Sequence, residues 1–560
     1  MPKRSREGSD DLIGFHPVKR NRNNEQGEEQ RVDYISSLSS ELLLHILSFL
    51  PMSSLNICQR LSHRFYLLAG DSELWKRQYY SRWVNPRVRR LANVTSRLAN
   101  SNIFPPHRIK YSPKVSTWLG HGHLAEEGRV AHWKTEYRLK HNWSNGVCRV
   151  TEVQLPEPPQ PPFLGKLCLG FMMTVDAAHG LRVCISRRPA CCVARALFGQ
   201  QPPSSVVPTA LTAAVKGPGQ NSIEVTVGFQ DGHFRVYDFD VKGLCLSLRY
   251  YGNFTDGAIT CIASSPPYLQ MISGDTLSLY EMPPPDNSSC GEPRQQEQPR
   301  VLASLKAESL VAPMTVSVRA GASEIISSIV YSFFHLGCGW SLGIQELRFS
   351  RDGKPIGSRL TTTVDSQYGN KRRSKIRPRI STTLATGPCI LHRQPPTSMS
   401  YSHPYLLTSH ADNTLTMYLV VSTGEDLFVK CGRRLWGHTS AISTVQVTDR
   451  GKAVSVSSTG DEMRVWDLET IVSDENSIPI TPENKVLRRG KSGDHVDDDG
   501  TPRRDDGLAL GQAARLAAEE GNRELEMMVM RGCVGFDEER VMLFRGKEQE
   551  SPWLECYDFT

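Results

Sequence analysis

Long apolar runs are missing from this chain of 560 residues. No stretch approaches the roughly eighteen apolar residues that a membrane-spanning helix needs, so we expect no membrane partner. The fourteen cysteines include no C-x-x-C pair, and no Cys/His cluster has the spacing of a zinc site, so we expect no bound metal. With no signal peptide at the start, we expect reduced thiols and a location in the nucleus and cytoplasm.

Motifs of common enzyme classes are also missing. The chain has no phosphate-binding glycine loop and no nucleophile motif, so we expect neither catalysis nor a cofactor. The net charge of +7 is modest, and much of the basic excess lies in short runs, which argues against nucleic-acid binding. Two runs, at Lys3-Arg4 and Lys19-Arg20, lie in a polar segment over 1–33 that should be disordered. Their spacing fits either a bipartite nuclear-import signal or a solvated basic tail.

From residue 34 the pattern becomes helical. Leu42, Leu43, Ile46, Leu47 and Leu50 recur at helical spacing, with Ser39 as an expected N-cap and Pro51 as a stop. The following segment to residue 83 holds further short helical patterns. So few short helices make a marginal core, which leaves two interpretations: a small self-contained bundle, or helices that bury a face against a partner.

The string from Leu38 to Pro51, continued by Leu55, resembles the opening of an F-box. In that family the segment docks on a Skp-type adaptor, which links it to a cullin scaffold. The resemblance implies that the adaptor is bound by Leu38, Leu42, Leu43, Ile46, Leu47, Leu50, Pro51 and Leu55. One departure is Ser39, where the family usually has proline.

The remainder is rich in short strand patterns separated by Gly, Asp and Asn turns. The clearest unit runs from Gly437-His438 to Trp466-Asp467 and resembles one WD repeat. Within it, His438, Ser457, Asp461 and Trp466 could form a buried hydrogen-bond chain across a four-stranded blade. A His/Ser/Asp trio could also serve nucleophilic catalysis, but in this order we favour the structural role.

Weaker copies of the unit predict about seven blades, with six or eight as alternatives. We therefore expect a multidomain chain: an all-α F-box followed by an all-β WD-type propeller. The expected parts are a disordered tail over 1–33, an F-box over 34–83, a linker with a helical segment over 84–163 and a propeller over 164–560. Three insertions, at about 282–300, 367–379 and 473–530, are expected to be solvated loops. The second is basic and could instead hold an acidic partner.

The resemblance to F-box/WD-repeat proteins implies a substrate receptor of an SCF-type ubiquitin ligase, with the propeller binding a protein client. The alternative is a scaffold that binds the adaptor without delivering clients. Receptors of this kind often hold a phosphorylated client through arginines near the blade turns. The matching positions here are not basic, so we expect client binding without such a phosphate pocket; they are Gln230, Gly274, Ala411, Ser443 and Gly460. The identity of the client cannot be read from the sequence.

Overall fold

The computed structural model contains two compact units, Met1–Leu74 and Trp75–Thr560. The structure describes residues 34–35, 37–84, 132–160, 162–198, 207–216, 222–253, 257–283, 298–306, 313–321, 323–367, 390–424, 426–457, 462–468, 534–547 and 550–560. The expected tail with Lys3, Arg4, Lys19 and Arg20 lies outside these ranges, as does most of each expected insertion. We describe each unit by itself.

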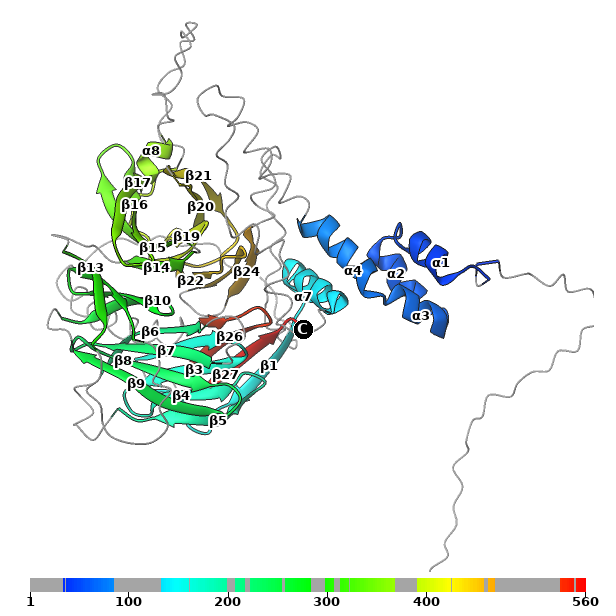
Figure 1. Ribbon diagram of the computed structural model, residues 1–560, viewed down its shortest axis with the longest axis horizontal. Coiled ribbons are helices and arrows are strands. Elements are labelled where there is room, and N and C mark those ends of the chain that lie inside the picture. The colour runs from blue at the N-terminus through cyan, green and yellow to red at the C-terminus, as the bar shows by residue number, and fades with distance from the viewer. Residues whose placement is uncertain are drawn as a thin grey trace, which may run out of the picture. The chain divides into compact units, whose positions relative to one another are not determined.

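The first unit is a set of short helices (Figure 1). They are α1 (Ser40–Leu47), α2 (Met52–Cys58), α3 (His63–Ala69) and the start of α4 (Ser72–Tyr79). The expected N-cap is confirmed, since the Ser39 hydroxyl accepts a hydrogen bond from the backbone N–H of Leu42. The helix ends at Leu47, and the chain continues in turns to Leu50, the residue in which Pro51 disfavours helical backbone.

A small core holds these helices together. Leu47, Leu55, Ala69 and Leu74 are buried against one another, with partly buried neighbours around them. Arg64 also ties α3 to the segment before α1 by donating a hydrogen bond of 2.6 Å to the Leu38 carbonyl. The unit therefore has an inside of its own.

The second unit begins with an aromatic cluster formed by the rest of α4, the π-helix η1 (Tyr80–Val84) and α7 (Trp133–Asn145). Tyr137 lies 4.7 Å from the Trp83 ring and 5.4 Å from the Trp75 ring, measured between centroids. Its hydroxyl accepts a hydrogen bond of 3.0 Å from Arg82. Aromatic contacts of this kind stabilise helix packing beyond the area they bury. α7 ends at Gly146, whose left-handed backbone is favourable for glycine.

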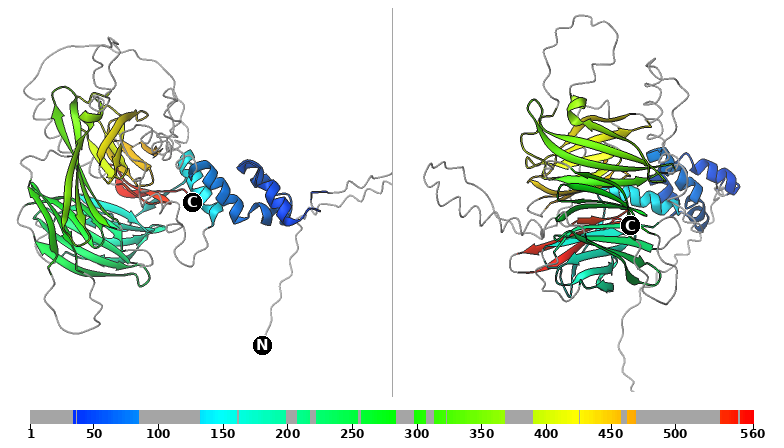
Figure 2. Two further views of the ribbon diagram at one scale, coloured as in Figure 1. Left: turned by 45° about the horizontal axis from the view of Figure 1, so that its top comes forward. Right: turned by 60° about the vertical axis from the view of Figure 1, so that its left-hand side comes forward.

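Seven sheets follow, and they form the predicted seven-bladed propeller (Figures 1 and 2). The first three blades consist of β2 (Phe163–Cys168), β3 (Phe171–Asp176), β4 (Gly180–Ile185) and β5 (Arg188–Ala196); β6 (Pro208–Val215), β7 (Ser222–Phe229), β8 (His233–Asp240) and β9 (Cys245–Asn253); and β10 (Ile259–Ser265), β11 (Tyr268–Ser273), β12 (Thr276–Glu281) and β13 (Arg300–Lys306). The next three consist of β14 (Met314–Ala320), β15 (Glu324–His335), β16 (Gly339–Ser350) and β17 (Pro355–Thr362), which is followed by α8 (Thr363–Gln367); β18 (Ser398–Ser402), β19 (Tyr405–Ser409), β20 (Leu415–Ser422) and β21 (Leu427–Leu435); and β22 (Ile442–Val447), β23 (Lys452–Ser457) and β24 (Met463–Asp467).

The seventh blade closes the ring. It consists of β25 (Val534–Phe536), β26 (Arg540–Lys547), β27 (Glu550–Asp558) and, as its outermost strand, β1 (Arg149–Gln154). β1 pairs antiparallel with β27 along its whole length, from Arg149 opposite Asp558 to Gln154 opposite Trp553. The expected linker over 84–163 is therefore too long, because its last part is a propeller strand. Pairing of the first strand with the last removes two sheet edges that would otherwise be open.

The antiparallel order also defines two faces of the ring. In each blade whose four strands are described, the turn between the second and third strands lies on the same side as the end of the fourth strand, where the connection to the next blade begins. We call this side the upper face and the opposite side the lower face. The apolar core lies between neighbouring blades, for example where Val454 and Met463 of the sixth blade pack with Phe536 and Leu543 of the seventh. The sixth blade has three strands within the described residues.

Candidate functional site

The helix α1 carries apolar side chains on two sides. Leu43 and Leu47 point into the core of the helical unit. Leu42 and Ile46 are about half exposed, and Phe49, just beyond the helix, is 69% exposed. These three follow one another at i, i+4 and i+7, which places them on one face. We call Leu42, Ile46 and Phe49 the apolar docking face.

Further exposed apolar side chains lie on the same small unit. α2, the turn after it and α3 add Ile57, Leu61, Tyr66 and Leu67, while Tyr34 and Ile35 precede α1. Single exposed apolar residues are normal, but so many on a unit of this size indicate a surface that a partner covers. The second interpretation of the sequence, burial against a partner, accounts for them better than a self-contained bundle.

The predicted adaptor-binding residues divide between this surface and the interior. Leu42, Ile46 and Pro51 are exposed, and Leu38 and Leu50 are half-buried. Leu43, Leu47 and Leu55 are buried inside the unit, so the prediction that they contact the adaptor is wrong for these three. The physical reason is that consecutive residues of a helix lie about 100° apart, so Leu42 and Leu43 face different ways. Phe49 was missed, although its spacing from Leu42 could have revealed it.

The predicted hydrogen-bond chain exists in the sixth blade, with a different hydroxyl. The Ser455 hydroxyl accepts from the indole N–H of Trp466 at 2.8 Å and lies 2.6 Å from Nε2 of His438. Ser457, the predicted link, instead accepts from the backbone N–H of Glu462 at 3.1 Å. Both serines lie on the same face of β23, but Trp466 is opposite Ala453, two positions from Ser455 and four from Ser457.

The acidic member of this network is Glu462, since the predicted Asp461 lies outside the described residues. Glu462 accepts from the backbone N–H and the hydroxyl of Thr439 and from Arg464. Burial alone would raise its pKa, but these hydrogen bonds outweigh burial and hold the pKa of Glu462 below its usual value. The carboxylate is thus a charged structural group between a turn and a strand.

The histidine of the network is suited to structure rather than to catalysis. Burial lowers the pKa of His438 to about 4, against the opposing effect of Glu462. Ser455 is fully buried and already contacts both His438 and Trp466, so no substrate can reach its hydroxyl. The His/Ser pair therefore takes the structural role that the sequence favoured.

Several arginines of the propeller pair with buried carboxylates. Arg319 and Arg359 both contact the buried Glu346, at 2.6 and 2.8 Å. In the second blade, Arg249 pairs with the buried Glu224 at 2.8 Å. A phosphate could displace these contacts only by leaving a buried carboxylate without its counter-charge, which is costly. This arrangement agrees with the expectation that no arginine pocket for phosphate exists near the aligned turns, which stays a prediction.

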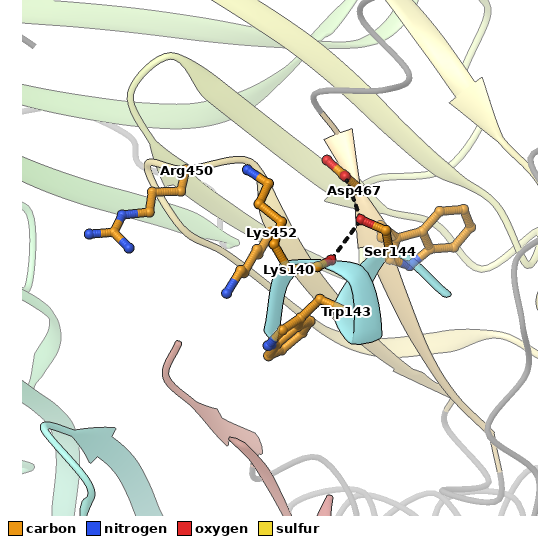
Figure 3. A pocket seen from close by; sticks show the side chains of 7 residues that line it. Lys140, Trp143, Ser144, Arg450, Lys452 and Asp467 are labelled. Carbon is orange, nitrogen blue, oxygen red and sulfur yellow. Dashed lines mark hydrogen bonds between the residues drawn. The ribbon is translucent and has the colours of Figure 1, made fainter. Parts of the chain in front are cut away.

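The helix α7 packs on the lower face, against the sixth and seventh blades (Figure 3). The Trp143 indole N–H donates a hydrogen bond of 2.7 Å to the Glu538 carbonyl, and the Ser144 hydroxyl donates one of 3.3 Å to the Asp467 carboxylate. The Lys452 ammonium lies 4.7 Å from the centre of the Trp143 ring and donates a hydrogen bond of 2.7 Å to the Glu538 carboxylate. Lys452 is already paired, so we interpret the small pocket beside Trp143 as a packing gap between α7 and the sixth blade and not as a ligand site.

Within the described residues, no helix is long and apolar enough to cross a membrane. The same part of the chain holds no cluster of three His, Cys, Asp or Glu side chains that could bind a metal.

Comparisons with known proteins agree with the two units. The family described as F-box-like matches residues 35–81. F-box protein pof12 of Schizosaccharomyces pombe is 27% identical over 141 residues, which cover 25% of this chain and 27% of that protein. F-box protein dre-1 of Caenorhabditis elegans is 44% identical over 52 residues, which cover 9% of this chain and 6% of that protein. The chain thus matches about a quarter of the first relative's length and much less of the second's.

Among solved structures, a chain of a structure described as "Crystal Structure of Mitotic Checkpoint Complex" covers 57% of this chain and 93% of its own length, with 10% identity and a TM-score of 0.30. That likeness is too weak to carry an argument. The family described as "F-box protein pof12 beta-propeller" matches residues 148–560, which begin just before β1 and include every blade. The chain therefore belongs to the F-box protein pof12 beta-propeller family and carries an F-box-like domain in front of its propeller.

Proposed function

We propose that this protein is a substrate receptor of a cullin-based ubiquitin ligase of the SCF type. In this proposal the helical unit binds a Skp-type adaptor, the adaptor links it to a cullin, and the propeller binds a protein client. The receptor itself is non-catalytic and acts in the nucleus and cytoplasm.

One observation carries the proposal. The helix α1 buries Leu43 and Leu47 in its own unit and still presents Leu42, Ile46 and Phe49 to solvent. Burying three such side chains contributes several kcal/mol at about 1.5–3 kcal/mol each. A helical unit with a core this small gains most from a partner that covers this face.

The test is co-purification of the full chain with its adaptor. Leu42→Asp together with Ile46→Asp should abolish adaptor recovery, because two charges would be buried at the contact. Both side chains lie outside the core of the helical unit, so the unit should remain folded. Val301→Asp, at an exposed apolar position on β13, is the matched control and should leave adaptor recovery unchanged. Normal recovery with the double variant would overturn the assignment of the docking face.

The scaffold alternative differs in the fate of bound proteins. A receptor's clients should accumulate on the propeller when the cullin is inhibited, and they should carry less ubiquitin. Proteins bound to a scaffold should show no change in abundance or ubiquitination under the same treatment.

A further inference from the structure

The upper face of the propeller carries exposed apolar side chains on the fourth blade and on the segments that enter and leave the fifth blade. Phe334 is the last residue but one of β15, and Leu336 occupies the tight turn that follows the strand. Leu391 precedes β18, and Trp436 follows β21. We call Phe334, Leu336, Leu391 and Trp436 the upper apolar patch.

Contacts between the blades join these residues into one surface. Phe334 packs edge-on against Trp340, with 6.0 Å between the ring centroids. The backbone N–H of Trp340 donates a hydrogen bond of 2.9 Å to the His392 carbonyl. The Leu391 side chain packs against Gly339. A Cβ atom added at Gly339 would lie 3.1 Å from a methyl group of Leu391. The patch therefore continues from the fourth blade to the start of the fifth without a gap.

Arg434, on β21, links the segment that enters the fifth blade to the connection that leaves it. Its guanidinium donates a hydrogen bond of 3.4 Å to the Leu391 carbonyl and lies 5.6 Å from the centre of the Trp436 ring. It is also 3.9 Å from Asp412, a long contact to a half-exposed carboxylate. One cation thus sits in the middle of the patch, in contact with two of its members or their backbone.

The exposure of Leu336 has no explanation in the fold. Its side chain is 97% exposed, at a turn where a polar residue would be accommodated without cost. An exposed leucine among aromatic neighbours is typical of an anchor that enters a partner's surface. Phe334 and Trp436, each more than half exposed, are suitable neighbours for such an anchor.

Charge indicates the partner's chemistry. Arg393 is exposed close in sequence to Leu391, and Arg434 lies within the patch; the exposed acids on this side include Asp412 and, on α8, Asp365. The connection from Gln367 to Ile390, whose two described ends lie on this face, contains no acidic residue in its sequence and six basic ones: Lys371, Arg372, Arg373, Lys375, Arg377 and Arg379. A positive field of this kind attracts acidic segments and slows the approach of basic ones.

We propose that the upper apolar patch binds a client segment that alternates acidic with large apolar side chains. The inference rests on the proposed function, since it names the class of client that the propeller would present to the ligase. Apolar side chains of the client would cover Leu336 and Trp436, while its carboxylates would pair with Arg393 and Arg434.

The test uses the full chain and a fluorescent synthetic peptide in which Glu alternates with Leu and Phe. Leu336→Ser, which removes an apolar anchor without adding charge, should weaken peptide binding by at least about tenfold. Leu360→Ser is the matched control, because Leu360 is as exposed as Phe334 but lies on the outer strand of the same blade, and it should change nothing. Arg393→Gln should weaken binding and reduce its dependence on salt.

Several results would overturn the proposal. They are equal binding by the wild type and the Leu336→Ser variant, no detectable binding of the peptide, or equally tight binding of a peptide with Lys in place of Glu. Tighter binding of a thymidine oligonucleotide would indicate a nucleic-acid surface instead. Stronger peptide binding after removal of residues 368–389 would mean that this segment of the chain occupies the patch. A dimer that dissociates in the Leu336→Ser variant would identify an interface between copies.

The Leu42→Asp, Ile46→Asp variant separates this inference from the proposed function. Retained peptide binding with lost adaptor binding supports both. Retained adaptor binding in that variant, together with lost peptide binding in Leu336→Ser, contradicts the docking face and leaves the patch standing.

Discussion

The Trp143 ring stacks on the Phe559 ring with 4.1 Å between centroids and 15° between planes. Trp143 lies at the end of α7, before the first propeller strand, and Phe559 follows the last one. The beginning and the end of the propeller are therefore held together by a ring stack as well as by the pairing of β1 with β27.

Trp143→Ala should destabilise the propeller by about 3–5 kcal/mol, because a large buried ring leaves a cavity. The change also removes the hydrogen bond to the Glu538 carbonyl. Chemical denaturation measures the loss. Trp436→Ala, at an exposed ring, is the control and should change the free energy of unfolding by less than about 0.5 kcal/mol. Similar values for the two variants would contradict the closure role of Trp143.

Ser455→Ala should cost about 1–3 kcal/mol, because the Trp466 N–H and His438 would lose a buried partner. Thermal or chemical unfolding provides the measurement. Ser358→Ala, which removes an exposed hydroxyl on β17, should be nearly neutral. If both serines proved equally tolerant, the hydrogen-bond chain would not stabilise the sixth blade.

Acid should destabilise the propeller through a pair of stacked histidines. His392 and His410 lie 3.8 Å apart, and burial, as the main cause, lowers the pKa of His392 to about 4 and that of His410 to about 3. After burial, His392 further lowers the pKa of His410, while Arg434 lowers and Asp412 raises the pKa of both histidines. Folding thus favours the neutral rings over the unfolded state, where the histidine pKa is about 6.5.

Above about pH 6.5 both rings are neutral in the folded and the unfolded state, so the pair does not lower the free energy of unfolding. As the pH falls toward 4, the unfolded state takes up protons that the buried rings do not, and the free energy of unfolding declines by up to about 1.4 kcal/mol per pH unit for each ring. His410→Gln should lower stability at pH 7.5 and make its dependence on pH shallower. Urea unfolding at a series of pH values measures both effects. An unchanged slope in the variant would show that the loss of stability in acid arises elsewhere.

Cys192 should be more reactive than an ordinary exposed thiol. It is paired with the buried Cys184 across β4 and β5, and a hydrogen bond from Cys184 stabilises its thiolate. This bond holds the pKa of Cys192 below its ordinary value, although burial acts in the opposite direction, and raises that of Cys184. Cys184→Val should therefore move the pH midpoint of Cys192 alkylation upward, measured by mass spectrometry of the labelled peptide. Cys245, in another blade, is the internal control whose labelling should not change.

Client capture should not require phosphate held by the propeller's inner arginines. The fourth blade holds none of the aligned positions, and its cations Arg319, Arg348 and Arg359 are paired with Glu346 or Glu324. Phosphatase treatment of a lysate should thus leave client recovery unchanged. Loss of recovery would contradict this prediction and direct attention to the basic segment around Arg372.

Spacing alone was enough to predict the two architectures. The apolar period of α1 and the order of His438, a serine and Trp466 depend on local geometry, which short sequence windows contain. The repeats predicted about seven blades, with six or eight as alternatives, and the structure has seven. The apolar period and the order within a blade are properties of single helices and single blades, and the sequence by itself determined them.

Contacts between distant segments could not be predicted in this way. Whether Leu42 or Leu43 faces outward depends on which side of α1 receives Leu55 and Leu74. The choice of Ser455 over Ser457 depends on the register between two strands, because both serines point to the same face. The place of β1 depends on a strand at the other end of the chain. Only the tertiary structure decided these points, because periodicity gives the direction of a side chain within its own element and not the neighbour that it meets.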